Sequence, residues 1–142
     1  MSELFDISSL AVADTAPIHL KGPDGTHLYS NGKPIRIVLF SPGSPVFAEI
    51  EDRQVARATK RMQDNDGKLA LVPIEQRDNE QAEDLAALTV DFENFDFPAA
   101  ADKYGKEKFK ALYLNRKLGF IKEQVLKALR DWGKFTQTSS VD

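Results

Sequence analysis

The sequence predicts an α+β fold, mostly α, in which an N-terminal three-stranded β-meander is followed by about four helices in one domain. Three observations support this: alternation with turn residues over 17–40, apolar residues at helical spacing over 45–132, and a length of 142 residues that suits one domain. We therefore expect a flexible N-terminal arm at 1–16, a single domain over 17–135 and a frayed C-terminal tail at 136–142.

The meander is predicted from two turn signals that separate alternating segments. Gly-Pro-Asp-Gly at 22–25 marks the first turn, and a hairpin around it pairs Leu20 with His27. Asn31-Gly32 marks the second, because a type I′ turn needs positive φ at both central residues. Residues 35–40 are the strongest strand candidate, since alternate positions are apolar.

A helix is predicted from Pro45 to about Asp64. Ser44 is a favourable N-cap, and Pro45 suits the first helical position because its missing N–H would be unpaired there anyway. Asn65-Asp66-Gly67 then ends the helix. At 100° per residue, one apolar face is expected to turn inward. It consists of Phe47, Ile50, Val55, Ala58 and Met62.

Three further helices are predicted, over about 79–88, 105–114 and 118–132. A short apolar segment at 69–74 is a candidate edge strand, and residues 89–92 alternate and look extended. Gly133 stands where a C-cap glycine is expected. The residues expected to face inward are Ala82, Leu85, Ala86, Phe109, Leu112, Tyr113, Leu118, Ile121, Val125, Ala128, Leu129 and Trp132.

The residues that carry chemistry form no convincing catalytic, cofactor or metal site. The absence of cysteine excludes disulfides and thiolate sites. Ser41 and Ser44 lie beside Gly43 in a loop that could cradle an anion, but no Lys directly follows the glycine, and the only candidate His bases sit in the predicted hairpin. His19 and His27 flank Asp24, which is weak evidence for a metal.

The start of the chain lacks the pattern of a signal peptide, and no stretch is long and apolar enough to span a membrane. We expect a non-enzymatic protein without cofactor or metal.

Charge is unevenly distributed along the chain. Residues 74–102 contain nine acids and one base, whereas 103–134 contain ten bases and three acids. Arg53, Arg57 and Arg61 recur at i, i+4, i+8 and form a row that we call the arginine row. Because like charges at this spacing repel, an acidic group should lie near. The acidic segment, an acidic patch on a partner and a solvated face all remain open.

Two aromatic residues complete the candidate partner-binding set of Arg53, Arg57, Arg61, Phe95 and Phe120. Phe95 belongs to the run Phe-Glu-Asn-Phe-Asp-Phe at 92–97, which is either core or an exposed contact. Phe120 lies opposite the apolar stripe of the last helix, so it is a candidate exposed aromatic.

Two stretches together resemble a known family. The first is an apolar strand, then Leu-Phe-Ser-Pro-Gly-Ser-Pro-Val-Phe at 39–47, then an arginine-bearing helix. The second runs from Ala-Ala-Leu-Thr-Val-Asp-Phe at 86–92 through 109–113 and 118–125 to Trp-Gly-Lys-Phe at 132–135. In this order the chain resembles the tail assembly chaperones of long-tailed bacteriophages over about 17–135. Gly43 stands where that family usually has Asp, and Asp91-Phe92 where it commonly has Gly-Trp.

The resemblance implies a non-catalytic protein of the host bacterial cytoplasm that assists tail assembly and is absent from the mature virion. Such proteins are thought to coat the helical tape-measure protein and to recruit tail-tube subunits, and many are also made as a longer frameshifted product. Self-association remains open. The alternatives are a structural minor tail or completion protein of the virion, and a small regulatory nucleic-acid-binding domain that uses the arginine row. Overall acidity and the lack of aromatics interleaved with the arginines argue against nucleic acid.

Overall fold

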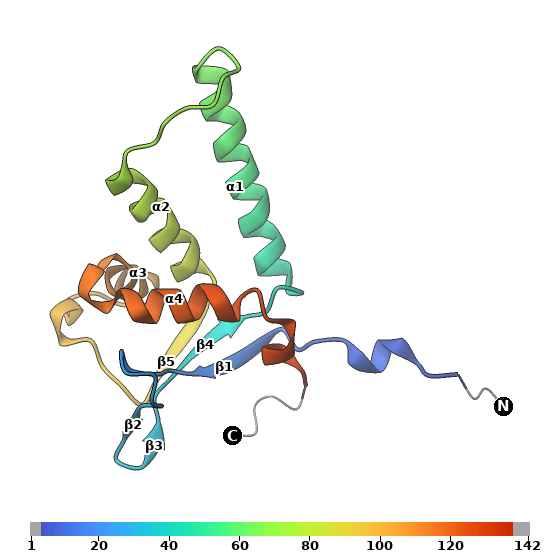
Figure 1. Ribbon diagram of the computed structural model, residues 1–142, viewed down its shortest axis with the longest axis vertical. Helices are drawn as coiled ribbons and strands as arrows, with labels where there is room; N and C mark the ends of the chain where they lie inside the picture. The colour runs from blue at the N-terminus through green and yellow to red at the C-terminus, as the bar shows by residue number, and fades with distance from the viewer. Residues whose placement is uncertain (1–3, 138–142) are drawn as a thin grey trace.

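The computed structural model describes residues 4–137, and within them the predicted class is confirmed: the fold is α+β and mostly α, with half of the residues helical (Figure 1). The strands are β1 Thr15–His19, β2 Tyr29–Ser30, β3 Lys33–Pro34, β4 Arg36–Phe40 and β5 Thr89–Glu93. The α-helices are α1 Pro45–Asp64, α2 Ile74–Ala87, α3 Lys106–Leu114 and α4 Gly119–Ala128. Short 3₁₀ turns lie at η1 Ile7–Leu10, η2 Pro98–Ala100, η3 Arg116–Leu118 and η4 Trp132–Phe135.

The main sheet has three antiparallel strands in the order β1-β4-β5, so the predicted pairing of the meander is wrong. β1 pairs directly with β4, with Ile18 opposite Ile37, and the third strand comes from β5 far along the chain. Leu20 N–H bonds Ile35 C=O, so the pairing of β1 with β4 continues to this point. The residues between these two, 21–34, fold through the two turns into a cap at the end of the strand pair. The segment predicted as the middle strand therefore lies outside the sheet.

The cap contains both predicted turns. Asn31 and Gly32 have φ of 53° and 77°, as a type I′ turn requires, and β2 pairs with β3 across them. Around the first turn, Lys21 is the partner of His27, one residue away from the predicted Leu20. The carboxamide of Gln124 on α4 exchanges two 2.7 Å hydrogen bonds with the backbone of Lys21, which holds α4 against the cap.

The bounds and caps predicted for α1 are confirmed. Ser44 Oγ accepts a hydrogen bond from Phe47 N–H at 3.2 Å and donates to Ser41 C=O at 2.7 Å. At the other end, Gly67 adopts a φ of 77° and its N–H bonds Met62 C=O. The loop before α1 thus ends a strand and starts a helix.

The predicted inward face of α1 is mostly wrong. Ile50 is buried and Phe47 is half-buried against the core, but Val55 and Met62 are 66% and 39% exposed and Ala58 is exposed. The helix instead turns its arginine row toward α2. Residues 69–73 form no strand, because they connect the far end of α1 to α2 with no strand beside them (Figure 1).

The core lies between the sheet and α2, α3 and α4. The inward residues predicted for α2 and α3 are buried, although α2 begins at Ile74, five residues before the prediction. The hydroxyls of Thr89 and Tyr113 lie 2.7 Å apart in the core and join β5 to α3. α4 ends at Ala128, four residues early, so Trp132 is 55% exposed and Gly133 belongs to η4 rather than to a C-cap.

The C-terminal segment that contains η4 packs against the residues just before β1. Phe135 is fully buried, and its C=O accepts a 2.8 Å hydrogen bond from Ala13 N–H beside β1. A Cβ at Gly43 would lie 3.0 Å from Val12 Cγ2 and 3.3 Å from Trp132 Cζ3, so a larger residue here would require these side chains to shift by a few tenths of an ångström.

Both chain ends differ somewhat from the prediction. The predicted arm at 1–16 is shorter, because β1 begins at Thr15, and η1 forms within it. Residues 1–3, and residues 138–142 of the predicted tail, lie outside the described residues. Gln137 side-chain N–H bonds Ala11 C=O at 3.2 Å, so the C-terminal end of the described residues contacts the chain just before β1.

Replacing Ser44 by Ala removes the side-chain cap of α1 and should lower the free energy of unfolding by about 1 kcal/mol. The measurement is urea denaturation followed by circular dichroism. Ser9→Ala, which removes an exposed hydroxyl that caps no α-helix, should leave the midpoint unchanged. Equal midpoints for Ser44→Ala and wild type would show that the cap contributes nothing.

Candidate protein-binding surface

α1 and α2 are joined by a network of charges centred on Asp84. Arg53 Nη2 donates to Asp84 Oδ1 at 2.7 Å, and Arg57 grips both carboxylate oxygens at 3.1 and 3.2 Å. Gln54 Nε2 adds a 3.1 Å hydrogen bond. One turn away on α2, Glu80 pairs with Arg61. The acidic segment is therefore the partner of the arginine row, as one of the sequence alternatives anticipated.

The network keeps a buried carboxylate charged. Asp84 is 5% exposed, and burial alone would raise its pKa. Hydrogen bonds from Arg57, Gln54 and Arg53 outweigh this burial, so the pKa of Asp84 lies below its ordinary value. The hydrogen bond with Asp84 in turn raises the pKa of Arg57. The two helices are thus held by desolvated charges as well as by apolar packing near Ile50.

The five residues predicted to bind a partner do not form one surface. The arginine row lies between α1 and α2, and the side chain of Arg53 remains 45% exposed. Phe95 stacks on Phe92 with ring centroids 4.6 Å apart and is half-buried. Phe120 is also half-buried against the core, so the expectation of a freely exposed aromatic is wrong there. A partner-binding role for these five residues stays a prediction.

The outer side of α1 carries an exposed apolar row that sequence reasoning placed in the core. It consists of Val55, Ala58 and Met62, and we call it the outer row. At 100° per residue, Val55 and Met62 lie about 150° from the middle of the arginine row, so one face cannot be buried without exposing the other. Leu69 and Leu71, in the connection from α1 to α2, are also exposed. The carboxylates Glu80 and Asp84, spaced i, i+4 on α2, were the signal that could have identified the correct face.

A cleft of about 390 Å³ opens between α1 and α2, and we call it the α1–α2 cleft. Leu85, Leu88 and Leu129 contribute its buried apolar floor, and Phe47 and Leu126 are half-buried at its sides. The charged network around Asp84 forms one wall. The cleft therefore offers apolar contact beside charged groups.

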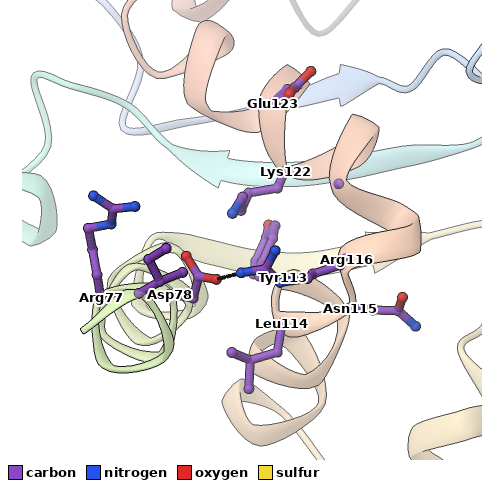
Figure 2. A pocket seen from close by; sticks show the side chains of 10 residues that line it. Arg77, Asp78, Tyr113, Leu114, Asn115, Arg116, Lys122 and Glu123 are labelled. Atoms are coloured by element: carbon purple, nitrogen blue, oxygen red, sulfur yellow. Dashed lines mark hydrogen bonds and ion pairs between the residues drawn. The ribbon is translucent and has the colours of Figure 1, made fainter.

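A second hollow, of about 410 Å³, lies where α2 meets η3 and α4 (Figure 2). Arg116 from η3 pairs with Asp78 from α2 at 2.9 Å, as the dashed line in the figure marks. Lys122 and Glu123 on α4 add one charge of each sign, and Arg77, which also lines the α1–α2 cleft, adds a further positive charge.

The histidines and the loop serine that the sequence offered as candidate site residues are held by packing and hydrogen bonds within the fold. The rings of His19 and His27 stack with centroids 4.3 Å apart, and His19 Nε2 lies 2.9 Å from Leu28 C=O. Ser41 is fully buried, which keeps its hydroxyl from solvent. Over residues 4–137, three or more His, Asp or Glu side chains do not gather in a group that could hold a metal ion. Over the same residues, no helix has the length and apolar character needed to cross a membrane.

Comparisons with known proteins found no match to this chain among family models, curated proteins or solved structures. The resemblance to phage tail assembly chaperones therefore stays a proposal, and it depends on the motifs in the sequence.

Replacing Asp84 by Asn should lower the free energy of unfolding at pH 7 by roughly 1.5–3 kcal/mol, because charged hydrogen bonds to Arg53 and Arg57 are lost. The measurement is urea denaturation between pH 7 and pH 3. Because the pKa of folded Asp84 is lowered, its contribution is present above the pKa of the unfolded state and disappears as the pH falls below roughly 4.

The difference between wild type and Asp84→Asn should therefore narrow on acidification. Asp52→Asn makes the same chemical change at an exposed residue of α1 and should behave like wild type. A variant as stable as wild type at pH 7 would show that the network does not hold α1 against α2.

Proposed function

We propose that this protein is a non-enzymatic tail assembly chaperone of a long-tailed bacteriophage, which binds the tape-measure protein and helps to recruit tail-tube subunits. In this proposal it acts in the host bacterial cytoplasm and is absent from the mature virion. The motifs at 39–47 and 86–135 supply the family resemblance. The observation that carries the proposal is the outer row of α1, which presents apolar side chains to solvent on a helix that stands out from the sheet (Figure 1).

An exposed apolar row on a helix suits a helical partner. An amphipathic helix packs its apolar face against such a row through residues spaced i, i+3 and i+4. Val55 and Met62 are seven residues apart, which is two helical turns, so they can form two successive contacts along a partner helix. A long helical protein without its assembly partners exposes apolar surface that would otherwise aggregate, and covering that surface requires contact area rather than catalytic groups.

The charge network supports the same function because it fixes the exposed face. If α1 rotated to bury the outer row, Arg57 and Asp84 would lose their ion pair and leave a carboxylate without its partners. The apolar row is therefore held in solvent by an opposing electrostatic constraint. This is the behaviour expected of a binding surface that must persist before the partner arrives.

Co-expression with a fragment of the tape-measure protein from the same phage should keep that fragment soluble and allow both chains to be purified together. Val55→Asp combined with Met62→Asp should weaken co-purification by about tenfold or more, since apolar contacts at the centre of an interface dominate binding. The control is Ala56→Asp with Gln63→Asp, which places the same charges at the same spacing on the neighbouring exposed face of α1.

Equal loss in both double variants would show that the outer row is not the binding surface. Failure of the wild-type chain to purify with either the tape-measure or the tail-tube protein would contradict the function itself. Mass spectrometry of purified phage particles separates a chaperone from a structural component: the chain should be absent, and its stoichiometric presence would favour a minor tail or completion protein.

A further inference from the structure

The N-terminal arm, residues 4–14, has apolar side chains that its own copy leaves in solvent. Phe5 and Ile7 are 68% and 72% exposed, and Leu10 is also exposed. The arm nevertheless has local order, because Asp6 Oδ1 accepts hydrogen bonds from the backbone N–H and the hydroxyl of Ser8 at the start of η1. Its residues 4–10 extend away from α1, α2 and the rest of the body (Figure 1), whereas Val12 packs against the core and Ala13 N–H bonds Phe135 C=O. Exposed apolar residues on an ordered arm indicate a binding partner.

The chemistry of the arm is acidic as well as apolar. Residues 4–14 contain two acids, Asp6 and Asp14, and no Lys or Arg. A surface that receives the arm should therefore combine an apolar floor with cations that lack partners.

The α1–α2 cleft has both properties. Leu85, Leu88 and Leu129 contribute its floor, and its carboxylates, Glu80 and Asp84, already pair with arginines of α1. Arg77 and Arg130 also line the cleft, are exposed, and form no side-chain hydrogen bond or ion pair with any of residues 4–137. The uncompensated charge of the cleft is therefore positive.

We propose that the N-terminal arm of one copy of this protein occupies the α1–α2 cleft of a second copy. Phe5 and Ile7 contact the apolar floor and sides of the cleft, and the acidic groups of the arm lie beside Arg77 and Arg130. The arm binds the cleft of a second copy rather than its own cleft, because its first residues extend away from its own body. This contact does not depend on the proposed function, since it needs only this chain.

The contact predicts that the full-length protein self-associates as its concentration rises, and that salt weakens the association because exposed charges contribute to it. Sedimentation velocity and light scattering measure the association. Phe5→Ser combined with Ile7→Ser should weaken it by about tenfold or more without changing the circular dichroism spectrum, since both side chains are exposed within one copy.

The cleft is tested by charge reversal with a matched control. Arg77→Glu combined with Arg130→Glu should weaken association to a similar extent. Lys60→Glu combined with Lys122→Glu makes the same change in net charge outside the α1–α2 cleft and should leave association unchanged. Val55→Ser combined with Met62→Ser removes the outer row as an alternative binding surface for the arm. This double variant should also leave self-association unchanged.

A photo-crosslinking amino acid at position 5 gives a direct test. Mass spectrometry should find intermolecular crosslinks to residues that line the α1–α2 cleft, such as Phe47 and Leu126. A chain that stays monomeric at all concentrations, association that survives Phe5→Ser/Ile7→Ser, or crosslinks to the outer row or to another protein instead of the cleft would each overturn the proposal.

Discussion

The buried carboxylate of Asp84 sets the orientation of α1. A charge at 5% exposure is tolerated only with partners that compensate its desolvation, and Arg53 and Arg57 supply them. Because those arginines occupy one side of α1, the apolar residues on the other side are left in solvent. The outer row and the α1–α2 cleft both follow from this arrangement.

The three-stranded sheet and the buried C-terminal segment form the part of the fold from which these surfaces extend. β4 lies between β1 and β5, so it connects the first strand of the chain to the strand that follows α2. Phe135 is fully buried, and Val12 and Trp132 lie close to Gly43 in the loop that precedes α1. Two segments that expose apolar residues, α1 and the N-terminal arm, therefore extend from one core.

The candidate site was only partly predictable from the sequence. The repeat of Arg53, Arg57 and Arg61 correctly indicated nearby acids, because like charges at i, i+4 spacing need compensation. The position of those acids on α2 was one of several alternatives, and only folding selected it. Phe120 was misassigned because its burial depends on the elements around it, which the period of its own helix does not reveal.

The sequence by itself determined the features that depend on neighbouring residues. Ser44 and Pro45 start α1, Asn31-Gly32 forms a turn, and the apolar spacing of α2 and α3 identifies their buried faces. Only the tertiary structure decided that β5 completes the sheet, that Phe135 enters the core and that α1 turns its arginines inward. The physical reason is range: caps, turns and helical periods are fixed by groups a few residues apart, whereas the desolvation of Asp84 is compensated by arginines about 30 residues earlier in the chain.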